Sequence, residues 1–62
     1  MNYTEKMPEV LWRIEDIQRF TGIKSRATIY KLMRKGLKSI KLEGSLRFNP
    51  ETVKQYFKGL EA

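Results

Sequence analysis

Cysteine and histidine are both absent from the 62 residues of this sequence. Without cysteine there can be no disulfide, no thiolate zinc site and no cysteine nucleophile. Without histidine the chain lacks the commonest general base and the commonest metal ligand. The carboxylates are scattered along the chain, so we expect no nucleophile–base pair. We therefore expect no enzyme, no metal site and no cofactor.

Long hydrophobic runs are absent as well. No stretch approaches the roughly 18 apolar residues of a membrane span, and the first residues lack the pattern of a signal peptide. We expect a cytoplasmic protein without a membrane partner, associated with the bacterial nucleoid. Hydrophobic residues make up 40% of the chain and include one Trp, three Tyr and three Phe. That is enough for one small core, so the chain is not a disordered basic tail.

Acidic residues are scarce in the middle of the chain. The whole sequence has 13 basic and 7 acidic residues, a net charge of +6. Residues 24–47 contain eight basic side chains and a single acid, Glu43, so the entire excess of positive charge lies there. Such segregation is typical of a surface that binds a polyanion. A surface that only keeps a protein soluble would not require it.

A first helix is predicted over residues 14–21. Ile14, Ile17 and Phe20 recur at helical spacing. Two acidic residues follow Ile14 in the first turn, where they face the positive end of the helix dipole. Gly22 then ends the helix, because glycine readily takes the left-handed conformation found there.

A second helix is predicted between Ser25 and Gly36. The Ser25 hydroxyl can accept from the free amides of the first turn. Ile29, Leu32 and Met33 form one buried stripe at positions i, i+3 and i+4, and the basic residues lie away from it. Because a short turn separates the two helices, they predict a helix–turn–helix.

The segment IKLEGSLRF, residues 40–48, changes to a period of two and predicts a hairpin. Its connection is either Gly44–Ser45 or Glu43–Gly44. Lys41 and Arg47 are expected on a basic face, opposite the apolar residues. A third helix then begins with Asn49 as N-cap and Pro50 in the first turn. Its buried stripe is expected to hold Val53, Tyr56, Phe57 and Leu60.

The expected fold class is mainly α with a small β-hairpin. The elements run helix, turn, helix, two-stranded wing, C-terminal helix, which is a winged helix-turn-helix. Residues 1–10 are expected to form a loose N-terminal arm, with a short edge strand near Trp12, and residues 11–62 to form the domain. The expected core draws on every element: Trp12, Ile14, Ile17, Phe20, Ile23, Ile29, Leu32, Met33, Leu37, Ile40, Leu42, Phe48, Val53 and Phe57.

The segment from Leu11 to Leu60 resembles the excisionase-like and MerR-type winged-helix DNA-binding domains. The resemblance rests on a helix ending in TGI, on SRATIYKLMRKG after it, on the hairpin IKLEGSLRF and on the Asn-Pro helix start. It implies that the second helix enters the major groove and that the wing reaches the adjacent minor groove. Small members act as recombination directionality factors for the integrases of phages or mobile elements, or as transcription regulators. MerR-type regulators continue into a long dimerising helix, and we expect no ligand-sensing dimeric regulator here.

The basic middle segment is accordingly expected to bind double-stranded DNA. Base edges are read from the N-terminal and outward positions of such a helix, and the expected readers are Arg26, Ala27, Lys31 and Arg34. Arginine and lysine suit guanine, and an alanine methyl suits thymine. Phosphates are expected to contact hydroxyl and ammonium groups, those of Lys24, Ser25, Thr28, Tyr30, Lys35 and Lys38. The wing is expected to contribute Lys41, Ser45 and Arg47.

Structural roles stay open for some of these residues. Ser25 serves as a helix cap whatever else it contacts, and Tyr30 can shield the edge of the core. Arg47 can pair with Glu15 or Asp16. Trp12 is expected in the core rather than as a stacking platform for bases.

The leading hypothesis is a sequence-specific, excisionase-like recombination directionality factor that bends DNA and assists a site-specific integrase. A single small domain binds one site weakly, so neighbouring copies on repeated sites are expected partners. A small repressor or activator of the same kind of element is the alternative. From another class, the domain is a basic protein-interaction module that binds an acidic partner. RNA binding is less favoured, because the aromatic residues are not interleaved on a sheet.

Overall fold

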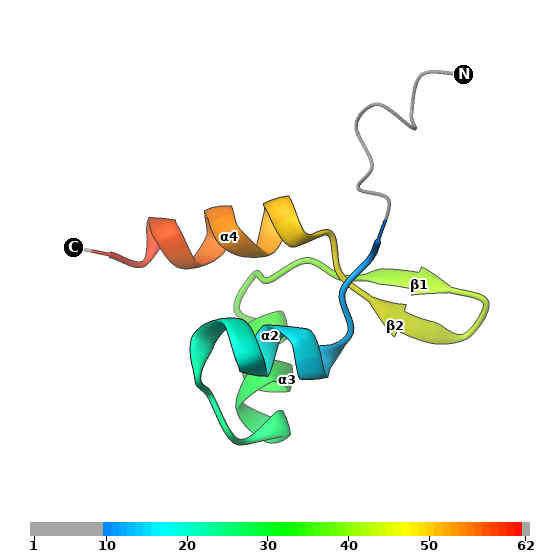
Figure 1. Ribbon diagram of the computed structural model, residues 1–62, viewed down its shortest axis with the longest axis horizontal. Helices are drawn as coiled ribbons and strands as arrows, with labels where there is room; N and C mark the ends of the chain where they lie inside the picture. Colours follow the sequence, from blue (N-terminus) through cyan, green and yellow to red (C-terminus); the bar gives the residue numbers. More distant parts are fainter. Residues whose placement is uncertain (1–9, 62) are drawn as a thin grey trace.

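The computed structural model describes residues 10–61. The part of the chain so described contains three helices and one two-stranded antiparallel hairpin (Figure 1): α2 Ile14–Thr21, α3 Arg26–Arg34, β1 Ile40–Leu42, β2 Ser45–Arg47 and α4 Pro50–Gly59. The fold class is therefore mainly α with a small hairpin, and it is compatible with a winged helix. Nine of the ten residues expected to form the N-terminal arm, 1–9, lie outside the described residues, as does Ala62. Within the described range, no helix has both the length and the apolar character needed to cross a membrane.

Helix α2 begins and ends as predicted. The Asp16 carboxylate accepts a hydrogen bond of 2.9 Å from the backbone N–H of Arg13, just before the first turn. At the other end Gly22 has a left-handed φ of 82°, and its N–H donates to the Gln18 carbonyl at 2.7 Å. A residue with a Cβ is strained in this conformation. Gly22 thus sets the point at which the chain leaves α2 and turns toward α3.

Side-chain caps begin the other two helices. Ser25 Oγ accepts from the backbone N–H of Thr28 at 3.3 Å, at the start of α3. Asn49 Oδ1 accepts from the backbone N–H of Glu51 at 2.9 Å, and Pro50 occupies the first turn of α4. Both predicted caps are confirmed. They satisfy amides that have no partner within the helix.

The hairpin closes on Glu43–Gly44, the second of the two connections considered. Both residues have positive φ, 50° and 81°, as a two-residue type I′ turn requires. The register that follows pairs an apolar residue with a polar one at every position: Ile40 with Arg47, Lys41 with Leu46, and Leu42 with Ser45.

This register shows that the predicted division into an apolar and a basic face is wrong. Cross-strand partners share a face of the hairpin, so Arg47 lies with Ile40 and Lys41 lies with Leu46. One common apolar face would need an odd number of loop residues. Relative to that register, a two-residue turn shifts one strand by one residue. Because side chains alternate between faces, this shift moves every side chain of that strand to the other face of the hairpin. As a consequence Leu42, expected in the core, is 49% exposed.

The core lies where the three helices meet the base of the hairpin. Its buried hydrophobic residues come from all these parts: Ile14, Ile17, Ile29, Leu37, Phe48 and Val53. Most of the remaining predicted core residues are half-buried: Trp12, Ile23, Leu32, Met33, Ile40 and Phe57. Trp12 and Phe48 exchange two backbone hydrogen bonds of 2.8 Å. The extended stretch predicted before α2 therefore joins the edge of the hairpin as a single bridge.

Besides Leu42, two more residues predicted to be buried are exposed. Phe20 is 47% exposed and Leu60 is 59% exposed. The Phe20 ring packs beside the rings of Trp12 and Phe57, with centroid distances of 5.5 and 6.3 Å. Three short helices cannot enclose every apolar residue of a chain this small. The aromatic rings thus form a partly exposed rim beside the core.

Candidate nucleic-acid interface

The basic surface is built around α3, and one side of this helix faces away from the core. Ile29 is fully buried on the inner side. Successive residues of a helix are rotated by about 100°, so Ala27, Lys31 and Arg34 fall on the side opposite Ile29. All three are exposed. We call them the outward stripe; they are three of the four residues expected to read bases.

The residues expected to contact phosphates surround this stripe. Each of them is exposed: Lys24, Ser25, Thr28, Tyr30, Lys35 and Lys38. On the helix, Thr28 and Lys35 lie on one flank of the outward stripe. Tyr30 lies on the other flank together with Arg26, next to β2. The stripe is therefore bordered on both sides by groups that can donate hydrogen bonds.

Helix α3 lacks the acidic first turn that the other helices have. Glu15 and Asp16 lie in the first turn of α2 and Glu51 in that of α4, whereas α3 has none. Acids at this position usually stabilise a helix by facing the positive end of its dipole. Their absence leaves the N-terminal end of α3 and its basic side chains without a negative charge on the same helix, which suits the approach of a polyanion.

Arg26, the fourth expected base reader, is engaged within the protein. Its Nη1 donates to Glu15 Oε2 at 3.3 Å, and both side chains are 53% exposed. A backbone hydrogen bond of Glu15, followed by the bond from Arg26, holds the pKa of the Glu15 carboxyl below its ordinary value. The carboxylate therefore stays charged at neutral pH. Sequence reasoning missed this pair, because it joins residues from two different helices.

The ion pairs considered for Arg47 do not form. Arg47 Nη1 donates instead to the backbone carbonyl of its neighbour Leu46 at 2.9 Å. Asp16, the second partner considered, pairs with Arg19 one turn further along α2. Arg47 is half-buried, whereas the other residues expected to contact DNA are exposed.

An open groove of about 290 Å³, which we call the wing groove, runs between α3, the start of α2 and β2. Its polar lining comes from all three: Arg13, Glu15, Arg26, Tyr30, Ser45 and Arg47. Two of the three expected wing residues thus lie beside α3, and Lys41 does not line the groove. Arg13 was not among the expected site residues. It precedes the first helix in a part of the sequence with no excess of basic residues, so only the folded structure reveals its position.

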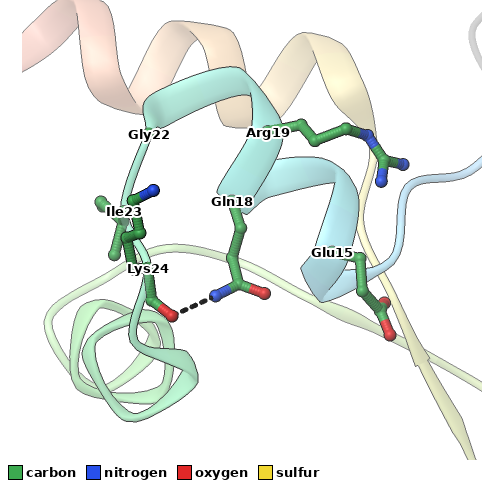
Figure 2. A pocket seen from close by; sticks show the side chains of 6 residues that line it. All are labelled: Glu15, Gln18, Arg19, Gly22, Ile23 and Lys24. Carbon is green, nitrogen blue, oxygen red and sulfur yellow. Dashed lines mark hydrogen bonds between the residues drawn. The ribbon is translucent and has the colours of Figure 1, made fainter.

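A second groove follows the turn between α2 and α3 (Figure 2), with a volume of about 540 Å³. Figure 2 shows Gln18 reaching from α2 to the turn, where its side-chain amide donates to the Lys24 carbonyl at 2.9 Å. Gln18 thereby fixes the backbone just before Ser25. Lys24, expected to contact phosphate, is held beside the N-terminal end of α3.

The comparisons with protein families, with curated proteins and with solved structures found no match to this chain. Among residues 10–61, no three acidic side chains are close enough to one another to hold a metal ion. The functional interpretation is therefore argued from the charge and geometry described above.

Proposed function

We propose that this protein binds double-stranded DNA with α3 in the major groove and the hairpin against the adjacent backbone. The single observation that carries the proposal is the outward stripe. It lies opposite the buried Ile29, is exposed, and belongs to a helix with no acidic residue. A solvated helix surface has no need of such a one-signed composition, whereas a surface that meets phosphates does.

A helix such as α3, Arg26–Arg34, fits the major groove by its diameter. An α-helix with its side chains is about 10–12 Å across, and the major groove is about 12 Å wide. We assign Lys31 and Arg34 to guanine edges and Ala27 to a thymine methyl. The flanking hydroxyl and ammonium groups are assigned to phosphates. If about five to seven phosphates are neutralised, the log–log salt slope of the binding constant is about −4.5 to −6.

The biological role that we propose is that of an excisionase-like recombination directionality factor. A single module of this kind buries roughly 600–1,000 Å² on DNA and binds one site weakly. Neighbouring copies on repeated sites, or contact with an integrase, would raise the effective affinity. The bent DNA would then help to assemble or disassemble the recombination complex. A small repressor or activator of the same element is the closest alternative.

Selection of bound duplexes from a random pool, followed by footprinting on the recovered site, tests the proposal. A recovered consensus with a steep salt dependence supports sequence-specific DNA binding. Direct repeats favour the recombination factor, and an inverted repeat favours a dimeric regulator. Equal binding to polyglutamate and to duplex DNA, with no consensus, would identify a module for acidic partners and overturn the proposal.

A further inference from the structure

Three arginines from three separate elements line the wing groove. Arg13 precedes α2, Arg26 begins α3 and Arg47 ends β2. Glu15 is the one acid in the lining, and it pairs with Arg26 alone. Among the described residues, neither Arg13 nor Arg47 forms an ion pair. Arginines that line one groove repel one another, and an anion bound between them would offset that repulsion.

Two hydroxyl groups complete the polar lining. Tyr30 projects from the same flank of α3 as Arg26, and Ser45 follows the turn of the hairpin. Hydroxyls and guanidinium groups are the side chains that commonly donate to phosphate oxygens in DNA complexes. The chemistry of the groove is therefore that of a phosphate site, and its place between α3 and the wing is where a DNA backbone would pass.

The ion pair between Glu15 and Arg26 is of a kind that a phosphate can replace. It consists of one contact of 3.3 Å between side chains that are each 53% exposed. Exposed pairs with a single contact contribute little to stability. A phosphate offers the guanidinium two parallel hydrogen bonds, a stronger arrangement.

We propose that the wing groove binds one phosphate of the DNA backbone through Arg13, Arg26 and Arg47. Glu15 holds Arg26 in the free protein and gives it up when the phosphate enters. The inference rests on the proposed function and adds to it. It adds Arg13 to the DNA-binding residues and reassigns Arg26 from a base contact to a backbone contact. Because Glu15 competes with the phosphate for Arg26, Glu15 lowers the affinity for DNA.

The direct test is a double-mutant cycle that combines protein variants with chemically modified DNA. Arg13→Gln is compared with Lys58→Gln, which removes the same charge from the last turn of α4. Each variant is titrated with the selected duplex and with duplexes carrying one neutral methylphosphonate at successive positions. We expect Arg13→Gln to weaken binding about tenfold and to reduce the salt slope by about 1. We also expect one methylphosphonate position that weakens the wild type clearly more than it weakens Arg13→Gln, because two of the three arginines remain in the variant.

The variant Glu15→Gln tests whether Glu15 lowers the affinity for DNA. Its matched control is Glu61→Gln, which removes the same charge beyond the C-terminal end of α4. We expect Glu15→Gln to raise affinity three- to tenfold on specific and random duplexes alike, and Glu61→Gln to change it less than about twofold, because screening weakens distant charges. Thermal melts show whether each variant is folded.

The outcomes separate the two proposals. If the wild type binds no duplex at low salt, both the proposed function and the phosphate site are overturned. If it binds, yet Arg13→Gln behaves like Lys58→Gln at every methylphosphonate position, the phosphate site is overturned and DNA binding stands. If Glu15→Gln binds DNA with the same affinity as Glu61→Gln, only the proposal that Glu15 lowers the affinity is overturned.

Discussion

Lys41 and Arg47 lie on opposite faces of the β1–β2 hairpin, because Lys41 pairs with Leu46 and Arg47 pairs with Ile40 across the strands. Arg47 lines the wing groove next to α3, and Lys41 does not. In the proposed complex, with a duplex along α3, the wing would therefore present one basic side chain to the DNA, not two. This asymmetry distinguishes the contributions of the two residues.

We predict that Arg47→Gln weakens binding to all duplexes about tenfold, while Lys41→Gln weakens it less than about threefold. Removing a phosphate contact also lowers the salt slope by about 1, so Arg47→Gln should show that change and Lys41→Gln should not. Fluorescence anisotropy at several salt concentrations measures both quantities. Equal losses for the two variants would mean that both faces of the hairpin touch DNA.

The outward stripe is expected to carry the base preference. Lys31→Ala or Arg34→Ala should cost about 1–3 kcal/mol on the selected site and relax the preference at one position. Lys35→Ala is the control, since it lies on the flank and is assigned to a phosphate; it should weaken specific and random duplexes alike. Repeating the selection with each variant shows the preference directly. If all three variants keep the wild-type consensus, the bases are read elsewhere.

We predict that the stability of the domain depends on the glycine at position 22, where α2 ends. Gly22→Ala should destabilise the domain by about 1–2 kcal/mol, because a Cβ disfavours the positive φ of 82° even though it meets no atom within 4 Å. Gly59→Ala is the control, since its Cβ also meets nothing within 4 Å and its φ is not positive. That variant should be neutral or slightly stabilising. Urea unfolding of both variants checks the difference, and equal midpoints would contradict it.

Glu43 is unfavourable at its position in the hairpin turn, so replacing it with a better-suited residue should stabilise the domain. Its φ of 50° is positive, and type I′ turns favour Asn-Gly at their two central positions. Glu43→Asn should therefore stabilise the domain by about 0.5–1 kcal/mol. Glu43→Gln removes the same charge without the conformational preference, so it should show little of this gain. A thermal melt of each variant makes the comparison, and a gain shared equally by both would point to charge instead of backbone conformation.

The parts of the fold that depend on neighbouring residues could be predicted from the sequence. The caps at Ser25 and Asn49 and the end of α2 at Gly22 are examples, since their signals lie within a few residues of the element. The sequence left two connections open for the hairpin, and only the structure decides between them. Both have two residues, so either one puts Lys41 and Arg47 on opposite faces, and the predicted common basic face did not follow from them. The Glu15–Arg26 pair and the place of Arg13 were also missed. Both arise from packing between elements, which periodicity does not reveal.

Asp16 should make the stability of α2 depend on pH. The hydrogen bond from the Arg13 backbone N–H, helped by the bond from Arg19, holds the pKa of Asp16 below its ordinary value. A carboxyl whose pKa is lower in the folded than in the unfolded chain stabilises the fold above the unfolded pKa, near 3.9, and loses that contribution as the pH falls through the folded pKa. Asp16→Asn should thus cost roughly 0.3–1 kcal/mol at pH 7.

The difference between the wild type and Asp16→Asn should shrink as the pH falls below about 4. Arg19→Gln separates the two causes, because it removes the side-chain partner and leaves the backbone hydrogen bond in place. Since the backbone bond is the larger cause, Arg19→Gln should keep most of the pH dependence that Asp16→Asn loses. Urea unfolding between pH 2.5 and 7 measures all three proteins. If Arg19→Gln abolishes the pH dependence as fully as Asp16→Asn, the ion pair, and not the cap at the start of α2, sets the pKa of this carboxyl.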